Sequence, residues 1–171
     1  VPFYKSEQAC EAVSAIFRAG VVPSALEFME REAIDWTIKY VEGISVPIKP
    51  EHQAHLLIEV DGNYPEVLML EAEKIMAVVD QFEIDEVLFA DTEDQKNALW
   101  KMRRAVGEAV KSNSIYKEED TVVPRYELPR LLEGVKKIGS KYGFHSVCYG
   151  HAGDGNLHVN IVKGDMTDAN W

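Results

Sequence analysis

The sequence is poor in cysteine and in basic residues. Its two cysteines, Cys10 and Cys148, lie in apolar surroundings without CxxC or zinc-finger spacing, so we predict two buried free thiols. The 18 Lys and Arg residues are outnumbered by 29 Asp and Glu, which gives a formal net charge of -11. This charge would repel a phosphate backbone or an anionic bilayer, so we expect no nucleic-acid partner.

Long apolar runs are also missing. No window approaches the roughly 18 to 20 apolar residues of a membrane-spanning helix, and the N-terminal residues lack the pattern of a signal peptide. We therefore expect no transmembrane segment and a cytoplasmic location, and peripheral membrane association of a parent enzyme stays open. The hydrophobic share of 46% over 171 residues suits one globular domain.

Apolar periodicity predicts helices and strands that alternate for most of the chain. The predicted helices are residues 6–18, 30–41, 65–82, 93–111 and 124–143, the last with Leu128, Leu131, Leu132, Val135 and Ile138 pointing inward. The predicted strands are residues 21–28, 54–60, 86–90 and 121–123, followed by two around His151 and His158. Residues 43–53 and 112–120 are predicted to be connectors, and Thr92 and Gln95 have the spacing of a helix capping box.

Two strands in succession near the end of the chain imply antiparallel pairing. The predicted fold class is therefore α+β, with a ferredoxin-like layer in which a mostly antiparallel sheet has its helices packed on one face. The sequence contains neither an internal repeat nor a flexible linker, so we expect residues 1–171 to form a single domain.

Residues 149–160, with the sequence YGHAGDGNLHVN, carry most of the chemical information. If Asp154 and Gly155 form a two-residue type I′ turn, His151 lies directly opposite His158. Opposed residues on a sheet have Cβ atoms about 4.5–5.5 Å apart, so both imidazoles could hold one metal ion or one ligand oxygen.

The alternation of residue types selects this arrangement over a slipped one. Leu157, Val159 and Ile161 would face the core, while Tyr149 and Asn160 would form the next pair on the histidine face. The simpler interpretation is that each histidine is an ordinary side chain and that the Asp-Gly pair is only a turn.

The run GHAGDGNLHVN resembles the signature of FAD-linked oxidases of the vanillyl-alcohol oxidase type, in the branch of glycolate oxidase flavoprotein subunits, D-lactate dehydrogenases and D-2-hydroxyglutarate dehydrogenases. The resemblance spans nearly the whole chain and includes ALEFME, LLIEVDG, LWKMRRAVGEAV and EDTVVPRYELP in that order. It implies the C-terminal substrate or cap domain of an enzyme that oxidises a small 2-hydroxyacid by hydride transfer to FAD. The FAD-binding domain and a final C-terminal segment would lie outside this chain, so the fragment alone should be inactive.

The same resemblance implies roles for single residues. His151 and His158 would be catalytic and would bind a divalent metal such as zinc, because they match the signature without a gap. Arg103 would bind the substrate carboxylate, Asn160 would help to bind the substrate, and Asn156 would face the flavin. The third metal ligand of the family, a Glu in a later Glu-His-Gly motif, is not among these residues, so we expect the fragment to retain zinc weakly.

Several alternatives remain open at this point. Arg103 could be a solvated charge on a helix surface, with the adjacent Arg104 matching the family position, and Asn156 could serve only the turn. The chain could instead be a free-standing module that binds a metal or a small acid, or a metal-dependent hydrolase with Asp154 as its base. A surface that normally meets a flavin-binding domain could also drive homo-oligomer formation.

Overall fold

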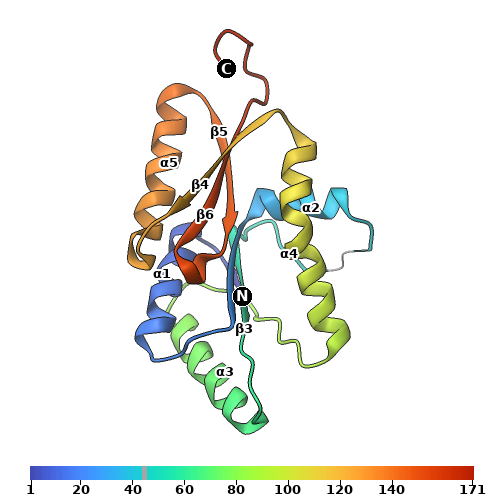
Figure 1. Ribbon diagram of the computed structural model, residues 1–171, viewed down its shortest axis with the longest axis vertical. Coiled ribbons are helices and arrows are strands. Elements are labelled where there is room, and N and C mark those ends of the chain that lie inside the picture. Colours follow the sequence, from blue (N-terminus) through green and yellow to red (C-terminus); the bar gives the residue numbers. More distant parts are fainter. Residues whose placement is uncertain (44–45) are drawn as a thin grey trace.

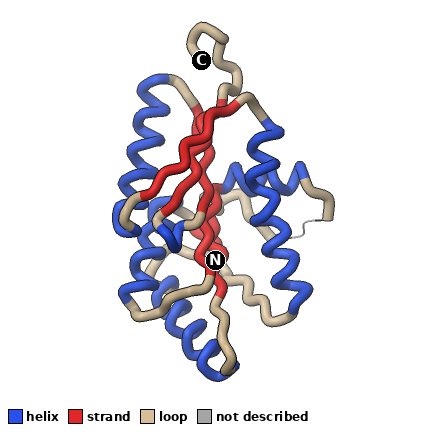
Figure 2. Tube along the Cα trace, in the orientation of Figure 1, coloured by secondary structure: helices blue, strands red, loops and turns tan. Residues whose placement is uncertain are grey.

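The computed structural model of the protein describes residues 1–43 and 46–171. These residues form a six-stranded antiparallel sheet with the strand order β1-β3-β2-β5-β6-β4 (Figures 1 and 2). The strands are β1 Pro2–Phe3, β2 Ala25–Glu30, β3 Ala54–Glu59, β4 Tyr116–Val122, β5 His145–Gly150 and β6 Asn156–Val162. The helices are α1 Ser6–Arg18, α2 Arg31–Tyr40, α3 Pro65–Val79, α4 Glu93–Asn113 and α5 Leu128–Tyr142, with short 3₁₀ turns at Arg125–Glu127 and Ala152–Asp154.

The helices are divided between the two faces of the sheet. Helices α1, α3 and α5 lie on one side of the sheet in Figure 1, and α2 and α4 lie on the other. Successive strand residues point to opposite faces, so Phe28 packs in the first apolar cluster and its neighbour Met29 in the second. The α+β class and the antiparallel sheet are confirmed, but packing on one face holds only for α1, α3 and α5, because the central strands are apolar on both faces.

The sequence predicted the starts of two helices correctly. Helix α1 has the predicted bounds. Helix α4 begins with the predicted capping box, in which the Gln95 backbone N–H donates to Thr92 Oγ1 and the Thr92 N–H donates to Gln95 Oε1. These bonds satisfy two donors that a helix start otherwise leaves unpaired, which is why the sequence signal was reliable.

Other predicted elements were wrong. Residues 86–90 do not form a strand, and Leu88 and Phe89 are exposed there. Most of the predicted connector 112–120 belongs instead to α4 and to β4, which pairs along β6. The charges of β4 suggested a loop, yet charged side chains are common on the edge strand of a sheet. Ile138, predicted to point inward, is 51% exposed.

The remaining boundaries moved by a few residues. Strand β2 begins at Ala25 rather than at residue 21, after Pro23, and it ends at Glu30. The predicted connector 43–53 includes residues 44 and 45, which lie outside the described residues. Both cysteines are free and buried, as predicted. Within the described ranges, no helix has both the length and the apolar character needed to cross a bilayer.

Gly155 supplies a backbone conformation that other residues adopt at a cost. It has φ of 76°, and a Cβ built on it would lie 2.0 Å from the carbonyl oxygen of Val123. We expect Gly155→Ala to lower the free energy of unfolding by at least about 3 kcal/mol, measured by urea denaturation. Gly143→Ala is the matched control, because Gly143 has φ of 75° with open space around it. Equal losses in the two variants would show that the close contact is unimportant.

Candidate functional site

Strands β5 and β6 meet in a different register from the predicted one. Tyr149 lies directly opposite His158, and Val147 lies opposite Asn160. The connection is a 3₁₀ turn, Ala152–Asp154, followed by a left-handed Gly155, so it is longer than a two-residue turn. The pairing of His151 with His158 was therefore wrong by two residues, but an even shift leaves every side chain on its predicted face.

The hairpin nevertheless brings the two histidines together. The ring centroids of His151 and His158 are 6.0 Å apart, and the planes are inclined by 73°. The His158 ring also lies 5.2 Å from the ring of Tyr149. The side chain of His151 is 55% exposed and that of His158 is 22% exposed, so a ligand arriving from solvent can reach the pair.

Each of these histidines has a carboxylate beside its Nδ1 atom. His151 Nδ1 lies 2.9 Å from Glu27 Oε1, within hydrogen-bond geometry. His158 Nδ1 lies 3.0 Å from Glu118 Oε1, although this contact is not aligned as a hydrogen bond. The hydrogen bond to Glu27 favours the His151 tautomer with the proton on Nδ1, which leaves its Nε2 lone pair for a ligand.

Glu27 also pairs with Arg103, and both residues are buried. Arg103 Nε donates to Glu27 Oε2 at 2.8 Å, and Arg103 Nη2 is 2.7 Å from the same oxygen. The guanidinium carbon lies 5.6 Å from the centroid of the Tyr149 ring. We call Glu27, Arg103, Tyr149, His151 and His158 the histidine cluster.

The neighbouring arginine is placed differently. Arg104 is exposed and lies over the ring of Trp100, with its guanidinium carbon 5.5 Å from the centroid. The structure thus assigns Arg103, and not Arg104, to the cluster, and the interpretation of Arg103 as a solvated surface charge was wrong. Its contact with a substrate carboxylate stays a prediction.

The two predicted asparagines flank the cluster. Asn160 is fully buried, and its Nδ2 donates to the Val147 carbonyl oxygen at 3.4 Å, while its Oδ1 has no hydrogen-bond partner. Asn156 begins β6, and its Nδ2 donates to Asp120 Oδ1 at 2.6 Å. Roles in binding substrate or flavin remain predictions for both residues.

Tyr149 is held beneath helix α4. A Cβ on Gly107 of that helix would lie 3.3 Å from Tyr149 Oη, so a small residue gives the phenol its space. Burial raises the pKa of Tyr149 above its usual value, and the nearby Glu118 carboxylate raises it further. Tyr149 is therefore a neutral phenol at physiological pH, and it can donate a hydrogen bond.

Glu27 was missed by the sequence analysis. A carboxylate between the apolar residues Leu26 and Phe28 of a strand is costly to bury without a partner. That cost was the available signal, because an acidic residue in a buried strand usually has a cation or a hydrogen-bond donor beside it. The sequence did not reveal that the partners would be Arg103 and His151, from elements far along the chain.

A small polar cavity borders the cluster. Its volume is about 140 Å³, and it is lined in part by Ser24, Glu27, Arg125 and His151. Its lining also includes Asp154 but not His158 or Arg103, and its size suits a small polar ligand rather than a large apolar one. Within residues 1–43 and 46–171, no three His, Cys, Asp or Glu side chains are grouped closely enough to hold a metal ion by themselves.

The buried ion pair can be tested through stability. We expect Glu27→Gln to lower the free energy of unfolding by about 3–5 kcal/mol, because it leaves the Arg103 guanidinium buried without a counter-charge. Glu133→Gln is the control, since the Glu133–Lys137 pair is exposed, with side-chain exposures of 54% and 71%. Urea unfolding followed by circular dichroism measures both variants. A Glu27→Gln protein as stable as the Glu133→Gln protein would contradict the importance of the pair.

Comparison with known families gives one match over the full chain. The family described as "FAD linked oxidases, C-terminal domain" matches residues 1–171. Among curated proteins, the chain is 33% identical over 175 residues to a D-lactate dehydrogenase of Anaerostipes hadrus, with 100% of this chain and 37% of that protein covered.

Two further curated relatives also match most of this chain. The glycolate oxidase subunit GlcD of Bacillus subtilis is 34% identical over 155 residues, covering 89% of this chain and 32% of that protein. A probable mitochondrial D-2-hydroxyglutarate dehydrogenase of Oryza sativa subsp. indica is 33% identical over 154 residues, covering 87% and 27%. The chain thus spans roughly a third of the length of these relatives.

Proposed function

Because the chain belongs to the family of FAD-linked oxidases, as their C-terminal domain, we propose that it is the substrate-side cap domain of a 2-hydroxyacid oxidoreductase. The substrate would be a small 2-hydroxyacid of the glycolate or D-lactate type, oxidised to the 2-oxoacid, and the flavin-binding domain would belong to the same parent chain. The observation that carries the proposal is the histidine cluster beside a small polar cavity, in a chain that matches the family along its whole length.

The arrangement of His151 and His158 is compatible with a divalent metal such as zinc. Each ring has a carboxylate near Nδ1, which is the usual environment of a metal-binding imidazole. In the part of the chain that the structure describes, two imidazoles are fewer ligands than a closed zinc site has. Water, substrate or another part of the parent protein would supply the rest. A bound metal would polarise the substrate hydroxyl and lower its pKa.

Oxidation of the 2-hydroxyacid requires the loss of a hydroxyl proton and of a hydride from the adjacent carbon. The flavin of the parent enzyme would accept the hydride. Where no metal occupies it, the Nε2 lone pair of His151 or His158 can accept the proton, and Glu27 would stabilise the resulting imidazolium of His151 through its 2.9 Å contact. With a metal bound at both Nε2 atoms, the proton would pass to another acceptor.

Arg103 and Asn160 are proposed to bind the substrate. Arg103 Nε donates to Glu27, whereas Nη2 lies 2.7 Å from Glu27 Oε2 without forming a hydrogen bond, so a substrate carboxylate would meet Nη1 or the unpaired Nη2. The unpaired Oδ1 of Asn160 is a buried acceptor that a substrate hydroxyl could satisfy. Asn156 is proposed to face the flavin from the start of β6.

The histidines can be tested in the parent enzyme. We expect His151→Ala and His158→Ala each to lower the rate of flavin reduction by D-lactate or glycolate at least about 100-fold, because each removes a nitrogen that serves as a metal ligand or, without metal, as the proton acceptor. Stopped-flow absorbance under anaerobic conditions measures this rate.

His145→Ala is the matched control for these variants. His145 begins β5, the strand that leads to His151, but its side chain is 54% exposed and pairs with Glu32, away from the cluster. Its rate should stay within a factor of about two of the unmodified enzyme, since surface substitutions rarely matter. If the cluster variants reduced flavin as fast as His145→Ala, the proposed function would be wrong.

The chain of 171 residues alone should bind zinc weakly. Two nitrogen ligands leave an open site, so we expect dialysis to remove added zinc, whereas the parent enzyme should retain it. Elemental analysis after dialysis against buffer measures the zinc content. One zinc per isolated chain would show that the described residues complete the site without help.

A further inference from the structure

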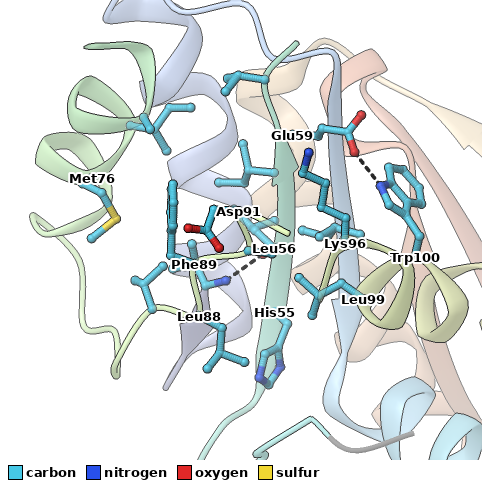
Figure 3. A pocket seen from close by; sticks show the side chains of 18 of the residues that line it. His55, Leu56, Glu59, Met76, Leu88, Phe89, Asp91, Lys96, Leu99 and Trp100 are labelled. Atoms are coloured by element: carbon cyan, nitrogen blue, oxygen red, sulfur yellow. Dashed lines mark hydrogen bonds between the residues drawn. The ribbon is translucent and has the colours of Figure 1, made fainter. Parts of the chain in front are cut away.

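A second cavity, larger than the one beside the histidine cluster, lies away from that cluster at the edge of β3. It has a volume of about 500 Å³, and its lining is mainly apolar. Figure 3 shows Met76 and Phe89 on one side of β3 and Leu99 and Trp100 on the other, so the cavity extends around the strand edge. We call it the edge groove.

Strand β1 covers only the beginning of this edge. Pro2 pairs with His55 and Phe3 with Ala54, and Val1 continues the ladder with two hydrogen bonds to Leu56. The Val1 nitrogen donates to the Leu56 oxygen at 2.8 Å, and the Leu56 N–H donates to the Val1 oxygen at 2.9 Å. Figure 1 shows the N-terminus beside β3.

The alternation of an antiparallel ladder identifies the next bonding position. The backbone N–H and C=O of Leu56 point toward β1. Those of Leu57 therefore point toward β2, where its partner is Glu27, and those of Ile58 point away from β2 again. Strand β1 does not reach Ile58. The backbone of Ile58 therefore points into the edge groove, ready to pair with an extended chain.

The nitrogen of Val1 is in an environment suited to a peptide bond. Burial lowers the pKa of its ammonium group from 8.0 to about 5. A protonated amine has three donors and a charge to satisfy, whereas Val1 has one hydrogen bond there, to Leu56. A peptide N–H needs only that one bond.

A second polar group in the groove lacks a partner. His55 lines the cavity, is only 6% exposed, and has an Nδ1 atom without a hydrogen bond. Buried polar atoms are nearly always paired in complete structures. Around them, Met69, Leu88 and Phe89 expose large apolar surfaces that an occupant would cover.

We propose that the edge groove receives an extended segment of the parent polypeptide, namely the residues that lead into Val1. The segment continues β1 antiparallel to β3, and its second residue before Val1 exchanges hydrogen bonds with Ile58. The inference rests on the proposed function, because it requires a parent chain. The family is described as a C-terminal domain, which implies residues before it, and the match covers only 37% of the D-lactate dehydrogenase.

Hydrogen exchange tests this pairing directly. The Ile58 amide should exchange at least about tenfold more slowly in the parent protein than in the chain of 171 residues, because a new hydrogen bond protects it. The adjacent Leu57 amide is the control, since it points to β2 and should be protected in both. Equal exchange of Ile58 in the two proteins would overturn the proposal. Such a result would be expected if the groove held a small ligand or a second copy of the chain.

Proline substitutions at Ile58 and Leu57 distinguish the backbone N–H that points away from β2 from the one that points toward it. Ile58→Pro removes a donor that the isolated chain does not use, so that chain should keep its sheet, whereas the parent should lose protection along β1. Leu57→Pro should disrupt the β2–β3 pairing in both proteins. If Ile58→Pro left the protection of β1 in the parent unchanged, the strand would not be added there.

The environment of Val1 can be tested without the parent. Between about pH 8 and pH 5, the Val1 amine of the free-amine chain is protonated in the unfolded state but neutral in the folded state. The unfolding constant should therefore rise as pH falls, up to about 1,000-fold over this range. N-terminal acetylation removes this part of the pH dependence. It leaves most of the part due to His55, whose pKa is lowered to about 3 mainly by burial and then by the Val1 ammonium, His52 and Arg31. Identical pH profiles with and without acetylation would mean that the amine is solvated, and would overturn the proposal.

Flavin reduction by a 2-hydroxyacid, measured on the same parent protein, tests the proposed function separately. The Ile58 amide can be protected in a parent protein that does not reduce flavin, and a parent protein can reduce flavin while the Ile58 amide is unprotected. The two failures are therefore distinguishable.

Discussion

The buried carboxylate of Glu27 is the contact on which the site depends. One oxygen accepts from Arg103 of α4, and the other contacts His151 at the end of β5. A buried carboxylate is tolerated only with such partners, and each partner in turn needs the carboxylate. Through these contacts, Glu27 connects helix α4 and the β5–β6 hairpin to the central strand β2.

The two-sided packing of the sheet determines how open the cluster is. The face that carries Tyr149 and His158 is partly covered by α4, and Gly107 lets that helix approach the tyrosine closely. As a result, Tyr149 is buried, while His158 is partly exposed and His151 more so. This gradient from a dry interior to an open rim is typical of a site that receives a small polar ligand.

The two edges of the sheet differ in a way that explains their different roles. Strand β4, at one edge, presents Lys117, Glu119 and Asp120, and such charges discourage pairing with another chain. Strand β3 carries Leu56, Leu57 and Ile58 near the other edge, where β1 is only two residues long. An apolar edge of this kind tends to pair with another chain unless something covers it.

The sequence alone determined the elements whose signals are local. Helix α1 and the capping box of α4 were predicted because their periodicity and hydrogen bonds involve neighbours in the chain. The alternation along β6 likewise placed His158 on the face opposite to Leu157. Only the tertiary structure decided the hairpin register, the strand character of the charged β4 and the partners of Glu27. Each of these depends on contacts between distant residues, and a local pattern carries no information about which distant residue supplies the compensating charge or hydrogen bond.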